Sequence, residues 1–235
     1  MASGTEKLLR VTRSKQAART SYNRMSRWYD ALAGGSEQKY CELGLQKLGA
    51  GAGELILEIG FGTGRAILAL AQAVGDTGRV YGLDLSDGML AIAQSRVHRL
   101  GLGHRVELQR GDALQLSYPV DFFDAVFACF TLELFDNPEI PVVLGECHRT
   151  LRDRGRLCIV SLAREEPPNL MPRLYEWAHR ALPSYVDCRP IFVRQAVEQA
   201  GFSIQAVTRK TMWGLPVEIV LAIKPSTPHR RYNHS

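Results

Sequence analysis

A glycine-rich turn with acidic residues near it is the part of this sequence whose residue types point most directly to chemistry. The stretch Glu58-Ile-Gly60-Phe-Gly62-Thr-Gly64 lies between an apolar run and a helical pattern. Glycines permit the positive φ of a tight turn and let a ligand lie against bare backbone. Asp84 ends the next apolar run, 20 residues beyond Gly64, where a ribose-binding carboxylate belongs. The pattern favours a nucleotide-like ligand over a plain strand–helix turn.

Two common nucleotide motifs do not fit this turn. A dinucleotide site of the form G-x-G-x-x-G requires glycine at position 65, where this chain has Arg65. A P-loop ends in Lys-Ser or Lys-Thr, and no such pair follows the glycines. The hypothesis of an NAD-dependent enzyme is therefore supported by the glycine loop alone.

Strand-like and helix-like patterns alternate around the turn. Short apolar runs predict strands over 55–59, 79–84, 105–109, 124–130 and 156–162. Helical patterns lie between them at 65–74, at 87–100 after an N-cap at Ser86, and at 138–151, closed by Asp153-Arg-Gly155. A helix near 190–200 and strand-like runs at 202–208 and 216–223 follow. Apolar strands alternating with helices indicate a parallel sheet covered on both faces, with ligands at the carboxyl ends of its strands.

The charge of the chain is concentrated at one end. The 235 residues carry a net charge of +5, and residues 1–30 hold seven basic and two acidic side chains, so the remainder is neutral. A protein that coats nucleic acid should carry its basic residues along the folded body, so no nucleic-acid partner is expected. The basic arm is expected either to be solvated or to make peripheral contact with an anionic membrane.

Cysteine usage and hydropathy predict the compartment. Five scattered cysteines (41, 129, 147, 158 and 188) form no CxxC pair, which is typical of neither a disulfide framework nor a zinc site, so no metal is expected. No apolar run reaches 18 residues, and the N-terminus lacks the apolar stretch of a signal peptide. These features favour a reduced, cytoplasmic location.

The spacing G-x-G-x-G after an acidic residue resembles motif I of the class I S-adenosylmethionine-dependent methyltransferases. The resemblance extends over residues 22–162. It includes Leu83-Asp-Leu-Ser-Asp-Gly-Met-Leu90, Gly111-Asp-Ala113, Phe122-Phe-Asp-Ala-Val-Phe-Ala-Cys129 and the helix and turn from Glu146 to Arg156. The closest type is the ubiquinone/menaquinone biosynthesis C-methyltransferase family, which also shares Tyr22 and Tyr29-Asp30 and a late Ala200-Gly-Phe202.

The resemblance implies a role for individual residues around S-adenosylmethionine. Gly60, Gly62, Thr63 and Gly64 would hold its methionyl end, and Asp84, followed by Leu85, would accept the ribose hydroxyls. Asp112 and Ala113 would meet the adenine, Met89 would pack on the purine, Cys129 would lie beside the sulfonium, and Tyr22 or Tyr29 would close over the cofactor. Ionised carboxylates suit these donors, because charge-assisted hydrogen bonds are the stronger ones.

Several of these residues have alternative interpretations. Asp84 would also interact favourably with a helix N-terminus, and Asp112 would also serve as a turn residue. Glu58, inside an apolar strand, is expected either to face the cofactor or to brace the loop, because an unpaired buried charge is costly. Cys129, Cys147 and Cys158 are expected to be core thiols rather than an arsenic site.

The resemblance also implies the architecture. We expect an α/β Rossmann-like, doubly wound sheet of seven strands, mostly parallel, with an antiparallel last strand. Residues 1–50 would form a basic, helical N-terminal arm with the helices that cover the cofactor. Residues 51–224 would form the cofactor-binding domain, with a lid or substrate insertion at 163–190, and 225–235 a flexible tail.

The function expected from the resemblance is methyl transfer to a small or lipid-like acceptor, such as a quinol or phenol ring carbon or oxygen. Alternatives are an N-methyltransferase for phospholipid amines and a non-catalytic regulatory protein that binds S-adenosylmethionine. A quinol or phenol must also lose a proton. His179, in the expected lid, is a weak candidate for that base.

Overall fold

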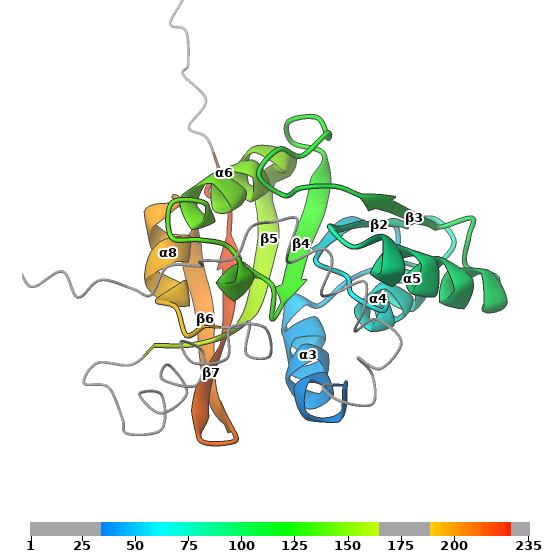
Figure 1. Ribbon diagram of the computed structural model, residues 1–235. Helices are drawn as coiled ribbons and strands as arrows, with labels where there is room; N and C mark the ends of the chain where they lie inside the picture. The colour runs from blue at the N-terminus through cyan, green and yellow to red at the C-terminus, as the bar shows by residue number, and fades with distance from the viewer. Residues whose placement is uncertain (1–33, 165–188, 227–235) are drawn as a thin grey trace, which may run out of the picture.

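A seven-stranded sheet with the order β3-β2-β1-β4-β5-β7-β6 forms the centre of the computed structural model, which describes residues 34–164 and 189–226 (Figure 1). The strands are β1 (Leu55–Ile59), β2 (Arg79–Asp84), β3 (Val106–Arg110), β4 (Phe123–Cys129), β5 (Leu151–Leu162), β6 (Ser203–Met212) and β7 (Leu215–Ile223). Strands β1 to β5 pair in parallel, and β7 pairs antiparallel with both β5 and β6. The expected fold class is confirmed.

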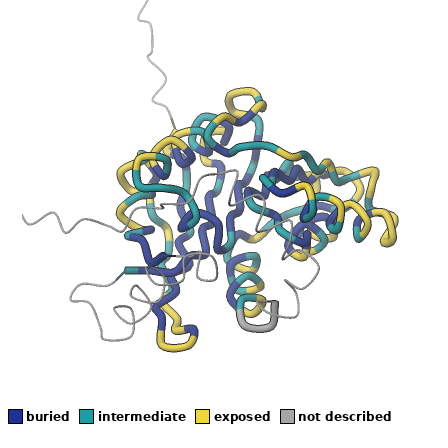
Figure 2. The backbone as a smooth tube through the Cα atoms, in the orientation of Figure 1, coloured by how far each residue is buried: buried dark blue, intermediate teal, exposed yellow. Residues whose placement is uncertain are grey.

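Helices cover both faces of this sheet. The first face carries α3 (Gly34–Leu48), α4 (Arg65–Val74) and α5 (Asp87–Arg99), and the second carries α6 (Ile140–Thr150) and α8 (Val193–Gln199). A short 3-10 turn, η1 (Leu132–Leu134), follows β4. Figure 2 shows the central strands as the most deeply buried part of the chain. The sheet therefore separates two hydrophobic cores.

The local sequence explains the helices beside the glycine turn. In α4 the buried side chains recur on one face at Ala66, Ile67, Leu70, Ala71 and Val74, the spacing of an amphipathic helix. α5 begins after Ser86, whose hydroxyl oxygen accepts a hydrogen bond from Met89 N at 3.2 Å, as predicted for an N-cap. Both helices therefore start at the carboxyl ends of β1 and β2.

The strand order reverses between β1 and β4. From β1 the chain proceeds outward to β2 and β3, then returns to the other side of β1 with β4 and β5. In a doubly wound sheet this switch point leaves a crevice at the carboxyl ends of the strands, where ligands bind. The glycine turn after β1 and the segment after β4 border that crevice.

Several predicted boundaries differ from the structure, most clearly at the turn predicted for 153–155. Strand β5 begins at Leu151, which pairs with Phe123, and not at residue 156, and α6 begins at Ile140 rather than at 138. The register changes between Phe123 and Ala125, and Arg154 has a positive φ of 63°. The polar residues read as a turn thus form an irregularity inside a long strand, because tertiary pairing with β4 overrides their local preference.

The expectations for the arm at 1–33, for the segment 165–188 with its His179 and Cys188, and for residues 227–235 lie outside the described residues, as do Tyr22 and Tyr29. Within the parts of the chain that the structure describes, no helix has the length and apolar character needed to cross a membrane.

Candidate functional site

The glycine turn is held in a conformation that only glycine adopts readily. Gly60, Gly62 and Gly64 have φ values of 71°, 52° and 84°. A Cβ on Gly60 would lie 2.3 Å from Thr131 Oγ1, and one on Gly64 would lie 2.8 Å from the Cβ of Ala93. The turn is therefore packed tightly between the segment after β4 and helix α5.

Gly62 differs from its two neighbours in the turn. A Cβ built on this residue would meet nothing within 4 Å. Its backbone is thus exposed to open space at the carboxyl end of β1, in the middle of a turn whose other glycines are enclosed. This open backbone is what a ligand needs to approach the main chain closely.

Asp84 joins the glycine turn to the start of α5. Its Oδ2 accepts a hydrogen bond from Gly62 N at 2.9 Å, and its Oδ1 accepts one from Ser86 N at 2.9 Å. Burial raises the pKa of Asp84, while the backbone N–H groups of Ser86, Gly62 and Leu85 oppose that shift. A carboxylate offers about four acceptor positions. Asp84 therefore braces the turn and keeps acceptor capacity for a ligand hydroxyl.

Glu58 is a buried carboxyl group with an unsatisfied oxygen. The residue is 3% exposed, and its Oε2 has no hydrogen-bond partner among the described residues. Burial raises the pKa of Glu58 well above its usual range, and the thiol of Cys41 and the charge of Asp84 raise it further. An unpaired polar atom in this position costs free energy. A hydrogen-bond donor or a cation next to Oε2 would remove this cost.

Thr63 is fixed by a residue that the sequence did not identify. Arg96, on α5, donates from Nη1 to Thr63 Oγ1 at 2.9 Å and to Thr63 O at 3.0 Å. These two bonds hold the buried Thr63 against α5. In the sequence, Arg96 is one of several basic residues near the end of a helix, so no local signal singled it out.

The residues expected at the adenine lie next to Asp84. Gly111 N donates to Asp84 O at 2.9 Å, which places the 111–113 segment beside the end of β2. Asp112 Oδ1 accepts from Leu114 N at 3.1 Å, so this side chain fills the turn role considered as its alternative. Ala113 and Met89 are buried on opposite faces of the sheet, whereas Leu85 is partly buried.

Cys129 ends β4 and is partly buried. Burial raises the pKa of its thiol well above the usual range, and the Cys41 thiol on α3, which shares a hydrogen bond with it, raises it further. A thiol in this state is a poor nucleophile. The side chain is therefore a small, neutral group at the crevice, and Cys41 is a second one that the sequence did not indicate.

Two further cysteines of the described residues, Cys147 and Cys158, belong to the hydrophobic cores. Cys147 belongs to the core on the α6 face and Cys158 to the core on the α3 face. Among the residues that the structure describes, no three His, Cys, Asp or Glu side chains form a group suited to a metal ion. Cys129 and Cys158 thus both contact the core on the α3 face, whereas Cys147 lies on the other side of the sheet.

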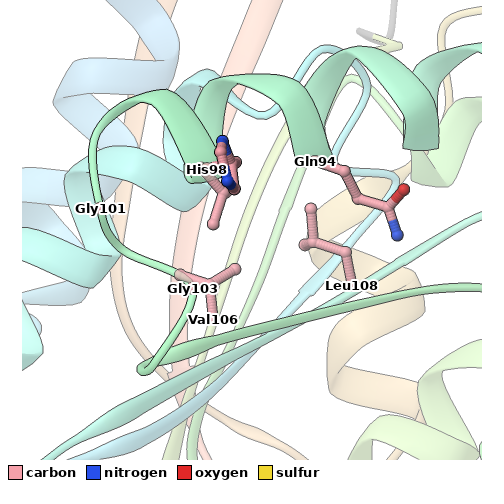
Figure 3. Close-up of a pocket in the computed structure, with 7 residues that line it drawn as sticks. Gln94, His98, Gly101, Gly103, Val106 and Leu108 are labelled. Atoms are coloured by element: carbon pink, nitrogen blue, oxygen red, sulfur yellow. The ribbon is translucent and has the colours of Figure 1, made fainter.

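A surface hollow of about 390 Å³ lies at the opposite end of the sheet (Figure 3). Gln94, Val97 and His98 on α5 line one side, and Val106 and Leu108 on β3 line the other. The loop that closes the hollow leads into β3, so it borders the amino end of that strand. This hollow is separate from the crevice at the glycine turn.

The crevice fits S-adenosylmethionine on the chemistry of its donor and acceptor groups. That molecule carries an ammonium, a sulfonium and two ribose hydroxyls. The unpartnered oxygen of Glu58 suits a positively charged group, and the open backbone of Gly62 admits the chain of the ligand. Asp84 ends β2 with acceptor positions for hydroxyl donors.

Comparison with known proteins supports this assignment. Residues 56–155 match a family model described as a methyltransferase domain. The 2-phytyl-1,4-naphtoquinone methyltransferase of Synechococcus elongatus is 33% identical over 141 residues, which cover 60% of each chain. The ubiquinone/menaquinone biosynthesis C-methyltransferase of Pseudomonas fluorescens is 30% identical over 148 residues, covering 63% of this chain and 56% of that one. The matched stretch thus spans less than two thirds of the length of either relative.

A solved structure shows the same architecture over most of the chain. The crystal structure of the [4+2]-cyclase SpnF matches with a TM-score of 0.73 and 19% identity, over 92% of this chain and 98% of that one. At this level of identity the likeness concerns the fold alone.

Proposed function

We propose that this chain, which carries a methyltransferase domain of the class I S-adenosylmethionine-dependent type, transfers a methyl group from S-adenosylmethionine to a quinone-type acceptor. The observation that carries the proposal is the open backbone of Gly62 between the carboxyl groups of Glu58 and Asp84. All three lie at the switch point of the sheet, where this fold binds its ligands.

The residues of the chain act by binding and alignment. S-adenosylmethionine supplies an activated methyl group on a good leaving group. Glu58 faces its positively charged part, Asp84 accepts from the ribose, and the packed glycine turn keeps both carboxyl groups in fixed positions. Holding donor and acceptor in line supplies about 7–11 kcal/mol of the barrier reduction in well-oriented reactions.

The proposed class of methyl acceptor is inferred from the relatives of this chain. Both relatives described above are named for methylation in naphthoquinone or ubiquinone/menaquinone synthesis. The lack of net charge outside residues 1–30 agrees with an uncharged acceptor. We therefore place a hydroxylated, reduced quinone ahead of a phospholipid amine.

Calorimetry with S-adenosylhomocysteine tests the cofactor site. The substitution Asp84→Asn removes the charged acceptor at nearly constant size, and loss of charged hydrogen bonds costs about 1.5–3 kcal/mol. The expected result is therefore an affinity about 10- to 150-fold lower than that of the wild type. Asp76→Asn, on the exposed loop between α4 and β2, is the control and should bind normally. Equal affinity for wild type and Asp84→Asn would refute the ribose role.

An activity assay tests the acceptor. Purified protein is incubated with methyl-labelled S-adenosylmethionine and 1,4-dihydroxynaphthalene, kept reduced without oxygen. Label in the naphthalene product is expected. Binding of S-adenosylhomocysteine with no transfer to this acceptor, but transfer to phosphatidylethanolamine, would replace the quinone proposal by the amine one.

A further inference from the structure

Glu133 is a second buried carboxyl group at the crevice, and the cofactor site does not use it. It lies in η1, two residues after Thr131, whose side chain occupies the space next to Gly60. Glu133 is fully buried, with 0% exposure. Its Oε1 accepts from Leu162 N, at the end of β5, over 3.1 Å, and its Oε2 has no partner among the described residues.

Arg189 is a buried cation on the same side of the crevice. It is 1% exposed, and its Nη2 donates to Phe135 O at 2.6 Å, two residues beyond Glu133. Its Nε and Nη1 find no hydrogen-bond partner within the described parts of the chain. The guanidinium thus has two N–H-bearing atoms to offer.

The backbone of Leu162 connects the two charged residues. Its N–H donates to Glu133, and its carbonyl accepts from Ile191 N at 3.2 Å, two residues after Arg189. Both side chains are therefore set against the carboxyl ends of β4 and β5, which lie side by side in Figure 1. The methyl group in the proposed function would be delivered at this edge of the sheet.

Glu133 and Arg189 carry opposite charges, yet polar atoms of both side chains lack a hydrogen-bond partner among the described residues. Among the described residues no Glu133–Arg189 hydrogen bond satisfies Oε2 of the one or Nε and Nη1 of the other. Burying a carboxylate and a guanidinium with free polar atoms is expensive unless something pairs with them. An acceptor hydroxyl fits both, since it donates to a carboxylate and its oxygen accepts from a guanidinium.

The surroundings of Glu133 suit a proton acceptor near neutral pH. The pKa of Glu133 is raised to about 7, chiefly by burial and also by the charge of Glu37 on α3, against hydrogen bonds from its own backbone, Leu162 and Ser161. The charges that face Arg189 are those of Asp136 and Glu133, which oppose the lowering of its pKa by burial. A base with a pKa close to the working pH is the most effective in general acid–base catalysis.

We infer that Glu133 takes the proton of an acceptor hydroxyl while Arg189 holds the resulting oxyanion, so that the site selects acceptors with an acidic phenol or quinol group. This inference rests on the proposed function and names the base that it requires. It assigns the role to the segment after β4.

The proton and electron changes balance without an oxidant or reductant. The O–H bond breaks, its proton goes to Glu133 Oε2, and its electron pair stays on the acceptor oxygen beside Arg189. That negative charge enriches the neighbouring ring carbon, which forms the new carbon–carbon bond to the methyl group, and the bond from methyl to sulfur breaks with its pair on sulfur. The ring carbon then loses its hydrogen as a proton to solvent, and the oxygen regains the proton from Glu133.

The first test is the pH dependence of methyl transfer to 1,4-dihydroxynaphthalene. For wild type, kcat/KM should rise with pH through about 7. Glu133→Gln should lower it about 10²- to 10⁴-fold and remove that rise, with unchanged affinity for S-adenosylhomocysteine. Glu42→Gln, an exposed change on α3, is the matched control and should behave as wild type. A Glu133→Gln variant with the rate and pH profile of wild type would overturn the inference.

A second test needs no turnover. The phenol 4-nitro-1-naphthol changes its absorption on ionisation, so its pKa can be measured when it is bound with S-adenosylhomocysteine. Wild type should lower the pKa of the bound probe, and Arg189→Gln should return it toward the value in water. The same bound pKa in both proteins would refute the role of Arg189. Absence of S-adenosylhomocysteine binding would instead refute the proposed function. The experiment therefore distinguishes a failure of the Arg189 role from a failure of the proposed function.

Discussion

Glu133 should make this protein less stable as the pH rises, and Glu133→Gln should remove that effect. A carboxyl group whose pKa is raised on folding stabilises the folded state fully only below its unfolded pKa, and the contribution is lost as the pH rises through the folded value. Here the two values are 4.5 and about 7.

The magnitude follows from the two pKa values. At 1.36 kcal/mol per unit, the raised pKa of Glu133 costs the folded state about 3 kcal/mol at pH 8, where the group is ionised, and about 1 kcal/mol at pH 5, where it is held protonated. Glutamine does not titrate, so any constant effect of its amide is the same at both pH values. The free energy of unfolding of Glu133→Gln relative to wild type should therefore increase by about 2 to 3 kcal/mol between pH 5 and pH 8.

Urea denaturation followed by circular dichroism measures this difference. Wild type, Glu133→Gln and the exposed control Glu42→Gln are unfolded at both pH values, and only differences from wild type are compared, which cancels the groups that all three proteins share. Glu42→Gln controls for replacing a glutamate by glutamine at an exposed position. If Glu133→Gln differs from wild type by the same amount at both pH values, Glu133 is not held in the high-pKa state, and the argument for a neutral-pH base fails.

Two further predictions concern the turn and the second face of the sheet. Gly60→Ala should lower the free energy of unfolding by about 1–3 kcal/mol and weaken the binding of S-adenosylhomocysteine. The φ of residue 60 is strained for alanine, and the new Cβ would overlap Thr131. Gly103→Ala is the control and should change neither measurement, because Gly103 has open space around it and no positive φ. Arg149→Met should reduce the unfolding free energy at pH 7 by about 2–3 kcal/mol, because the guanidinium bonds both oxygens of Glu146 and two backbone carbonyls. The pKa of Glu146 is lowered chiefly by Arg149, so the loss should shrink as the pH falls through and below 4.5, and a loss that stays constant would contradict this reason.

The features that could be predicted from the sequence depend on local geometry. Gly60 to Gly64 and Asp84 are identifiable because a strand, a tight turn and a helix must follow one another at fixed spacing. The structure brings them together as expected, with a direct bond between Asp84 and Gly62. The alternating apolar runs likewise predicted the layered sheet.

The features that could not be predicted depend on contacts between distant segments. Cys41 reaches Cys129 across 88 residues, and Arg189 lies 56 residues beyond Glu133. In the sequence, Glu133 is one charged residue in a run of leucines and phenylalanines, a pattern equally typical of a helix start. Its importance appears only when its burial and its bond to β5 are known.

The anchoring of residues 163, 164 and 191 has a consequence for protein engineering. Ala163 and Ile191 form a parallel bridge, and Arg164 N donates to Ile191 O at 2.9 Å, so the two ends of the intervening stretch are fastened together by the main chain itself. Since doubling the length of a closed loop costs only about 0.6 kcal/mol, the stretch between these anchors can be exchanged for one of different length at little expense in stability. An exchange limited to residues 165–188 would retain both Glu133 and Arg189. The ends of the exchanged stretch would thus be held together by main-chain bonds that do not depend on its own side chains.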